Sequence, residues 1–163
     1  MSFPARIDGI GTRLDTSTGS FNAVNLGARK PKFVRLYANA TIAKGDAVCF
    51  DMSVSTNGIG NHVIQAHLST NFRKYVIGIA AEAASSGDLL SIQVAGVCEF
   101  AKLLDDGDDP GDILSISTTA GQLTECLELD STGIFQIPCA ILAAEGDAAT
   151  ANSTVMLLNP LNL

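Results

Sequence analysis

The sequence predicts an all-β protein, a compact β-barrel or β-sandwich body that follows an extended N-terminal arm. Short apolar segments with a two-residue alternation succeed one another along most of the chain. Gly-Asp dyads precede several of these segments, and glycine and proline mark the connections. No segment keeps a 3.6-residue apolar period over ten or more residues, because glycine interrupts the alanine-rich stretches. Eight or nine short strands at this spacing favour a barrel or a sandwich.

The length and composition indicate one globular domain. The chain has 163 residues, which suits a single domain with a substantial core. With 47% hydrophobic and 17% charged residues it lacks the composition of a disordered chain. No apolar run reaches the roughly 18 residues of a membrane span, so no membrane contact is expected. Residues 1–20 contain no continuous apolar stretch after a basic start, so we expect synthesis in a cytoplasm without a secretory signal.

The first 32 residues are expected to lie outside the body as an arm. They are rich in Gly, Ser, Thr, Asn and Asp, contain Pro4 and Pro31, and have only scattered apolar residues. This composition disfavours both a helix and a core strand. The sequence therefore predicts an arm at residues 1–32 and a β-rich body at residues 33–163. A frayed terminus without a role is the alternative interpretation of the arm.

Charge is unevenly distributed between the arm and the body. Up to Arg35 there are six basic and two acidic residues, a balance of +4, whereas the remainder has four basic and fifteen acidic residues, a balance of −11. An acidic body repels phosphate, and the arm lacks dense basic clusters with interleaved aromatic residues, so no nucleic acid partner is expected. An acidic protein surface suits the arm better. The candidate partner-binding residues are Arg6, Arg13, Arg29, Lys30 and Lys32.

The body begins with the segment KFVRLYA, whose side chains alternate with the period of a half-buried strand. Apolar runs then return after each turn, and the segment LLSIQVAGVCEFAKL carries the strongest strand signal. The expected strands lie within residues 32–38, 47–52, 62–69, 73–83, 89–103, 113–118, 120–129, 133–145 and 153–163.

The Gly-Asp dyads are interpreted as tight turns. They occur at Gly45-Asp46, Gly87-Asp88, Gly111-Asp112 and Gly146-Asp147, in each case before a strand. Glycine adopts a positive φ without steric cost, and an aspartate side chain accepts hydrogen bonds from backbone amides in a turn. Repeated tight turns predict short connections and a closely wound β topology.

The order of these pieces resembles the small head-decoration, or capsid cement, proteins of tailed bacteriophages. The resemblance rests on a strand ending Ile77-Gly78-Ile79-Ala80, the Gly87-Asp88 turn and a strand ending Val94-Ala95-Gly96-Val97. It continues through the later pieces PGDILSIS, GQLTE and IPCAILAAEG, and covers roughly residues 33–160. Turn chemistry and strand alternation carry most of it, and the arm is longer than in the shortest members of the family.

The resemblance implies a body of the β-clip or β-tulip-like kind that is frequently trimeric and sits over the junctions between major capsid subunits. An N-terminal arm ties such a protein to the shell, and no catalytic residues come with the family. We therefore expect a virion structural protein on the capsid exterior, with the major capsid protein as its partner. A homotrimer is also expected because the closing segment 155–163, VMLLNPLNL, is more apolar than a solvent-facing terminus needs.

No residue pattern typical of catalysis stands out, so neither an enzyme nor a cofactor or metal site is expected. The serines lie in strand or turn settings without a Gly-x-Ser-x-Gly elbow, and no phosphate-binding glycine motif occurs. His62 and His67 would face opposite sides of one strand, which makes them poor joint ligands. Four widely spaced cysteines are expected to pack as free thiols, with a disulfide or metal site as the alternative. These are Cys49, Cys98, Cys126 and Cys139.

An acidic loop at residues 105–112 holds the densest charge, five aspartates in eight positions. Carboxylate oxygens can bind Ca²⁺, but the spacing does not match an EF-hand, so a solvated turn is the first interpretation. A bound cation or a basic partner is the alternative. The aspartates are Asp105, Asp106, Asp108, Asp109 and Asp112.

Two other functions compete with capsid decoration. One is a phage fibre or baseplate module that contacts the host, which predicts few copies in each particle. The other is a trimeric β-fold nucleotide hydrolase that holds a metal in the acidic loop. This second function is disfavoured because no arginine or lysine lies near that loop in the sequence to receive a phosphate.

Overall fold

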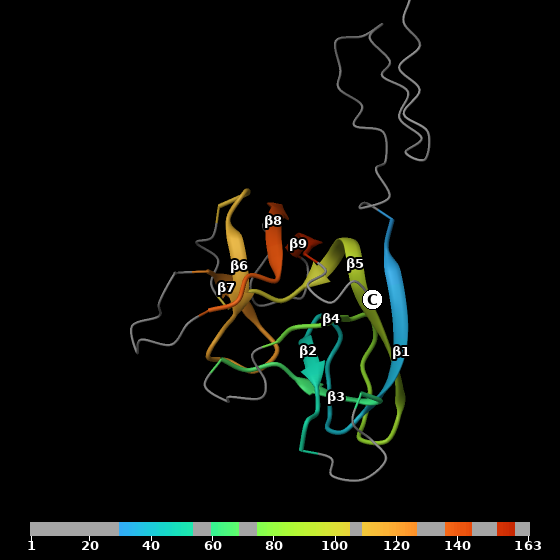
Figure 1. The fold of residues 1–163 in the computed structure, drawn as a ribbon. Coiled ribbons are helices and arrows are strands. Elements are labelled where there is room, and N and C mark those ends of the chain that lie inside the picture. Colours follow the sequence, from blue (N-terminus) through green and yellow to red (C-terminus); the bar gives the residue numbers. More distant parts are fainter. Residues whose placement is uncertain are drawn as a thin grey trace, which may run out of the picture.

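Strands form all the regular secondary structure in the part of the chain that the structure describes. The structure, a computed structural model, describes residues 30–53, 60–68, 75–104, 109–126, 136–144 and 153–158 (Figure 1). The all-β prediction is confirmed for these residues, whereas residues 1–29 of the predicted arm lie outside them. A search of the described residues found no helix long and apolar enough to cross a membrane. The strands are β1 (Lys32–Ala38), β2 (Ala47–Phe50), β3 (His62–Gln65), β4 (Gly78–Ala80), β5 (Leu89–Ala101), β6 (Ile113–Ile116), β7 (Leu123–Glu125), β8 (Ala140–Ala144) and β9 (Ser153–Leu157).

Several of the predicted strands, including those at 62–69 and 73–83, are shorter than expected. The segment 73–83 contributes only the three residues of β4. The segment 62–69 contributes β3, which ends at Gln65, so the prediction that one strand carries both histidines is wrong. The chain leaves the strand there because the Leu68 N–H donates to the Ser117 carbonyl oxygen (3.0 Å), a bond to a different part of the sheet.

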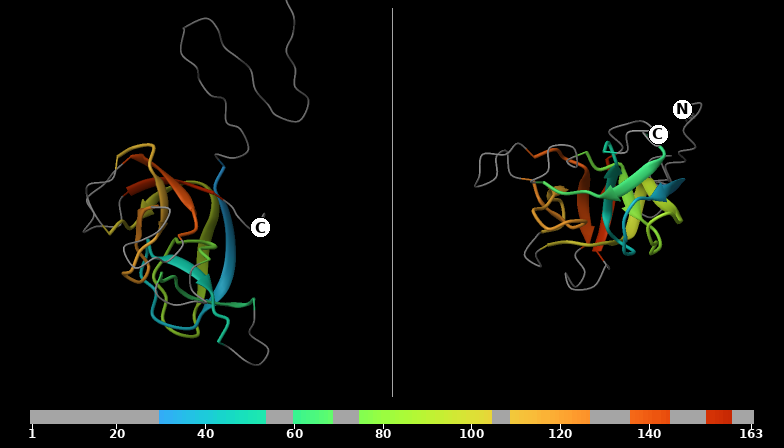
Figure 2. Two further views of the ribbon diagram at one scale, coloured as in Figure 1. Left: turned by 60° about the vertical axis from the view of Figure 1, so that its left-hand side comes forward. Right: turned by 90° about the horizontal axis from the view of Figure 1, so that it is seen from below.

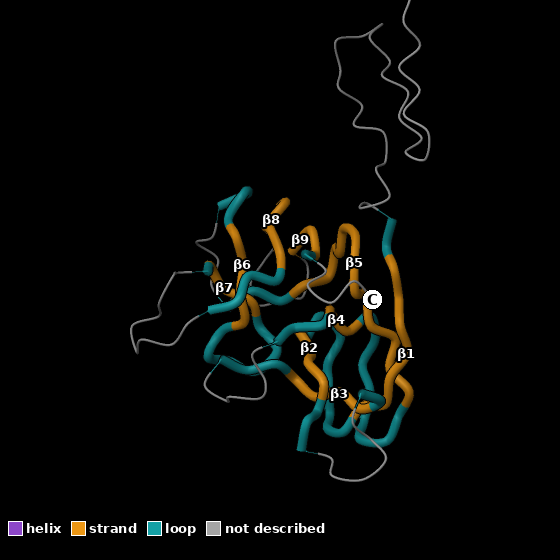
Figure 3. The backbone as a smooth tube through the Cα atoms, in the orientation of Figure 1, coloured by secondary structure: helices purple, strands orange, loops and turns teal. Residues whose placement is uncertain are grey.

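Pairing among the first five strands closes into a ring. The order of neighbours is β1-β3-β2-β4-β5, and a further antiparallel pairing joins β5 back to β1. Only β1 and β3 pair in parallel. We call these five strands, drawn in orange in Figure 3, the first ring. A closed ring leaves few backbone groups unpaired, which stabilises so small a sheet.

Strand β5 belongs to two sets of partners because it is 13 residues long. Its first half pairs with β1 and β4, and its second half pairs with β9, followed by β8, β6 and β7. A parallel bridge between Leu103 and Leu123 brings β7 back to the end of β5, so these strands form a second ring. The views in Figures 1 and 2 place β6 and β8 on the side of the molecule away from β1.

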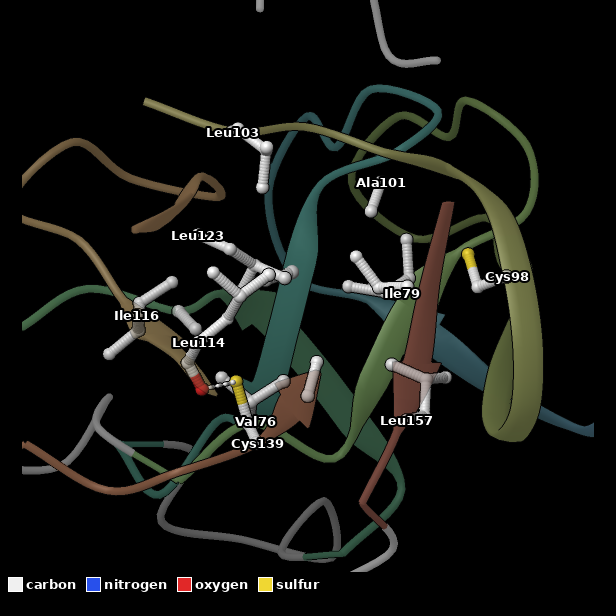
Figure 4. Packing of buried hydrophobic residues seen from close by; sticks show 14 of the residues in the cluster. Val76, Ile79, Cys98, Ala101, Leu103, Leu114, Ile116, Leu123, Cys139 and Leu157 are labelled. Atoms are coloured by element: carbon white, nitrogen blue, oxygen red, sulfur yellow. Dashed lines mark hydrogen bonds between the residues drawn. The ribbon is translucent and has the colours of Figure 1, made fainter. Parts of the chain in front are cut away.

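Two clusters of buried side chains hold the rings together. The inner core gathers residues of the first ring, including Val48, Leu90 and Ile92, which are fully buried. The shared core is larger and joins side chains of β2 and β4, such as Ile79, to those of the second ring (Figure 4). β2 therefore buries alternate residues in different cores, which explains its continuous apolar sequence.

The Gly-Asp turns share one geometry, and their interpretation as turns is confirmed at the three described dyads. The glycine has a positive φ of 87° at Gly45, 92° at Gly87 and 109° at Gly111. In each turn the aspartate side chain accepts the backbone N–H of the residue three positions earlier, at 2.8 to 2.9 Å. The backbone N–H of the aspartate also donates to the carbonyl oxygen of the same residue, three positions earlier, at 3.0 to 3.2 Å. The dyad Gly146-Asp147 lies outside the described residues.

Each of the three described dyads is also a β-bulge. The Gly45 N–H donates to the Ala80 carbonyl oxygen (2.8 Å), and the Ala80 N–H donates to the Asp46 carbonyl oxygen (2.9 Å). Gly87-Asp88 makes the same two bonds to Ala38, at 2.7 and 2.8 Å, and Gly111-Asp112 makes them to Leu142. The glycine and the aspartate therefore lie opposite a single residue of the neighbouring strand. The glycine is the first of the two and has a positive φ, which is the G1 form of the β-bulge. The dyads lock each turn onto a second strand.

The first ring contains an internal repeat with an offset of 42 residues. Residues 37–50 correspond in sequence order and hydrogen bonding to residues 79–92. The pairing of Tyr37 with Leu89 in β1–β5 corresponds to that of Ile79 with Ala47 in β4–β2. Residues 42 and 84 are equivalent and bond to each other through both N–H groups at 2.9 Å, so they mark a local two-fold axis.

Candidate partner-binding surface

Of the predicted partner-binding residues, the structure describes Lys30 and Lys32, whereas Arg6, Arg13 and Arg29 lie outside the described residues. Lys30 and Lys32 are both exposed, where the arm enters β1. They are therefore free to meet a partner, as the prediction requires.

The root of the arm is packed closely onto β5. A Cβ atom on Gly96 would lie 2.6 Å from the Lys30 carbonyl oxygen and 2.9 Å from the Pro31 nitrogen. Gly96 also has a φ of 85°, so only glycine fits there without strain. β1 and β5 then shift register by a bulge between Lys32 and Phe33. This contact fixes where the arm leaves the body.

Beyond the root, β1 presents a row of large side chains to solvent. Phe33 is 50% exposed and Tyr37 is 47% exposed, and Arg35 between them is also exposed. Leu89, directly opposite Tyr37 on β5, is 41% exposed. We call Phe33, Arg35, Tyr37 and Leu89 the open face. The opposite side of β1 packs Val34 and Leu36 against the inner core.

Tyr37 is flanked on both sides. Leu89 is its partner on β5, and His62 is its parallel partner on β3. The Tyr37 and His62 rings have centroids 5.7 Å apart and an interplanar angle of 32°. Contact with these neighbours limits the rotamers of the tyrosine, so little conformational entropy remains to be lost on binding a partner.

A partly buried ion pair joins Asp46, which precedes β2, to Lys102, which follows β5. The Lys102 Nζ donates to Asp46 Oδ1 at 2.6 Å, and the Asp46 side chain is 3% exposed. Asp46 Oδ2 accepts hydrogen bonds from Gln65 Nε2 (2.6 Å) and from the Ala43 N–H (2.8 Å). The carboxylate is thus satisfied within the protein. Its position, between residues of both rings, indicates a structural role.

The cysteines behave largely as their apolar surroundings predict. None of the four forms a disulfide: Cys49, Cys98 and Cys139 are buried, and Cys126 is partly buried. Burial raises the pKa of Cys98 to about 11 and that of Cys139 to about 12. Burial also raises the pKa of Cys126. A raised thiol pKa lowers the fraction of reactive thiolate at neutral pH.

Part of the acidic loop can be placed. Asp109 and Asp112 form the third Gly-Asp turn, with the Asp109 N–H donating to Asp112 Oδ2. Asp105, Asp106 and Asp108 lie outside the described residues. Among the residues that the structure describes, no group of three or more His, Cys, Asp and Glu side chains is arranged to hold a metal ion. The two described aspartates therefore act as turn residues.

The apolar closing strand, β9, packs against other strands of the same chain. Val155 and Leu157 of β9 are buried in the shared core, at 0% and 7% exposure. Their apolar character, which suggested a trimer contact, is explained by packing inside one copy. Residues 159–163 lie outside the described residues, and trimerisation stays a prediction.

Comparison with known proteins adds no relative. No protein-family model matches the chain. A search of curated proteins likewise found no significant match.

Proposed function

We propose that this protein is a capsid decoration protein of a tailed bacteriophage, one that binds the outer surface of the major capsid shell and stabilises it. The observation that carries the proposal is the cationic root of the arm, with Lys30 and Lys32 exposed and the backbone packed over Gly96. The sequence resemblance to capsid cement proteins supports the same function.

The uneven distribution of charge orients the molecule relative to an acidic surface. The segment up to Arg35 carries a balance of +4 and the remainder −11, so an acidic surface attracts the end of the molecule that bears the arm and repels the rest. An approaching molecule is therefore oriented with the arm first. On a shell each contact is modest, but it is repeated over many copies, and the summed effect stabilises the particle.

Cosedimentation tests the proposal. The full chain is mixed with purified particles of the phage that encodes it, assembled without the chain, and bound protein is quantified at increasing concentration. Saturation at a stoichiometry comparable to the number of capsid subunits, together with a higher particle melting temperature, is the expected result. Failure to bind overturns the proposal. Saturation at a handful of copies per particle favours a fibre or baseplate module instead.

A further inference from the structure

The first ring has two equivalent outer faces, because the internal repeat relates them by a two-fold axis. One face, here called the covered face, consists of Ala47, Cys49 and Ile79, and the second ring packs onto it in the shared core. The exposed fractions of these residues are 0%, 1% and 0%. The chain thus already uses this face of the repeat to bind a folded β-sheet.

The equivalents of the covered face lie on the other side of the ring. Ile79 corresponds to Tyr37, Ala47 to Leu89, and Cys49 to Ser91. Tyr37 and Leu89 are 47% and 41% exposed, and β6 and β8 of the second ring lie on the side of the molecule away from β1 (Figures 1 and 2). The open face therefore has the backbone pairing of a face that packs against protein, and it lacks such a cover among the described residues.

We propose that the open face docks onto an acidic protein surface that also offers apolar side chains. Under the proposed function, on which this inference rests, that surface belongs to the capsid shell. The open face combines Phe33, Tyr37 and Arg35, residue types that are enriched at protein interfaces and among the side chains that dominate binding energy.

Charge favours an acidic protein surface over two other partners, a second copy of the chain and a polyphosphate. Lys30, Lys32 and Arg35 are all exposed on or beside the open face, so a carboxylate-bearing surface is complementary to it. A second copy of the chain would place like charges opposite one another across a two-fold contact. Polyphosphate is a poorer fit, because these three cationic side chains do not form the dense basic cluster that is typical of nucleic acid binding. An acidic protein remains the best fit.

Binding by variants with altered surface residues tests the inference. Tyr37→Ala and Arg35→Glu are compared with the unchanged chain in the cosedimentation assay described above. Ile113→Ala, at a 49% exposed side chain on β6, is the control for lost apolar area, and Lys44→Glu is the control for charge. All substituted side chains are exposed, so circular dichroism and melting temperature are expected to confirm folding.

Tyr37→Ala and Arg35→Glu are expected to weaken binding at least tenfold, and the two controls to change it less than twofold. If wild-type protein binds and the open-face variants bind equally well, this inference is overturned while the proposed function stands. If wild-type protein does not bind at all, both fall.

Two further measurements test whether the open face binds single-stranded DNA or a second copy of the chain instead. Anisotropy with a fluorescent oligothymidylate detects single-stranded DNA, and tight binding that Tyr37→Ala abolishes would replace the acidic protein with nucleic acid. Analytical ultracentrifugation of the chain alone detects self-association, and a dimer that Tyr37→Ala dissociates would replace it with a second copy. Weak oligonucleotide binding and an oligomeric state unchanged by Tyr37→Ala are the expected results.

Discussion

The covered and open faces of the first ring have the same backbone pairing but opposite surroundings. On the covered face, Ile79 pairs with Ala47 and is fully buried; on the open face, Tyr37 pairs with Leu89 and both are nearly half exposed. The residue types follow the surroundings, small or aliphatic under the second ring and aromatic or cationic in solvent. The difference teaches that one repeated scaffold can carry a face that packs within the chain and an equivalent face that stays exposed to solvent.

The largest expected effect is on stability at the two equivalent strand positions. Ile79→Ala removes a fully buried side chain from the shared core and is expected to lower the free energy of unfolding by about 3 kcal/mol. Tyr37→Ala removes a half-exposed ring and is expected to cost less than about 1 kcal/mol. Urea unfolding measures both. Equal losses would break the distinction between a covered and an open face.

The second prediction compares the aspartates of two equivalent turns, Asp46 and Asp88. Asp46→Ala removes a buried carboxylate that accepts hydrogen bonds from Lys102, Gln65 and the Ala43 N–H, and it is expected to cost about 3 kcal/mol. Asp88 makes the equivalent turn bond to the Ser85 N–H in solvent, so Asp88→Ala is expected to cost about 0.5 kcal/mol. Lys102→Met in the Asp46→Ala background serves as the control, because it removes the uncompensated charge and is expected to restore part of the loss. No recovery would contradict the ion-pair interpretation.

The smallest expected effect is the pH dependence of stability that arises from two buried thiols in the shared core. The folded pKa values of Cys98 and Cys139, about 11 and about 12, are raised above the ordinary value of 9.0, so the unfolded chain loses these protons first. The stabilisation is complete below pH 9 and is lost as the pH rises toward 12. Between pH 8 and pH 10 each thiol is expected to reduce the free energy of unfolding by about 1 kcal/mol.

Urea unfolding at both pH values measures this loss. The double variant Cys98→Ala, Cys139→Ala is the control and is expected to show a smaller pH dependence than the wild-type chain. An identical dependence in both proteins would contradict the assignment to the buried thiols.

Local features of the fold were predictable from sequence because strands and turns depend on neighbouring residues. The alternation in residues 32–38 predicts β1, and the Gly-Asp dyads predict turns with positive φ. The sequence also contained a signal that the prediction did not use: Gly45-Asp46 and Gly87-Asp88 are separated by 42 residues. Few other identities survive in the repeat, because equivalent positions lie on the covered face in one copy and on the open face in the other.

The candidate site was only partly predictable. The positive charge of Lys30 and Lys32 is a property of the local sequence, and it identified the root of the arm. That Arg35 and Tyr37 face solvent, whereas Ile79 is covered, depends on where the second ring packs, and no local pattern encodes that contact. The pair of Asp46 with Lys102 joins residues far apart in sequence, so it too could be found only in the folded chain.

A cryo-electron microscopy reconstruction of the parent phage particle tests the central claim most directly. The chain is expected as repeated density on the outer surface of the shell, with β1 and the root of the arm toward the capsid and the second ring toward solvent. Tyr37 and Arg35 should contact an acidic surface that also offers apolar side chains. A shell without this density, or a bound chain with β1 facing solvent, would contradict it.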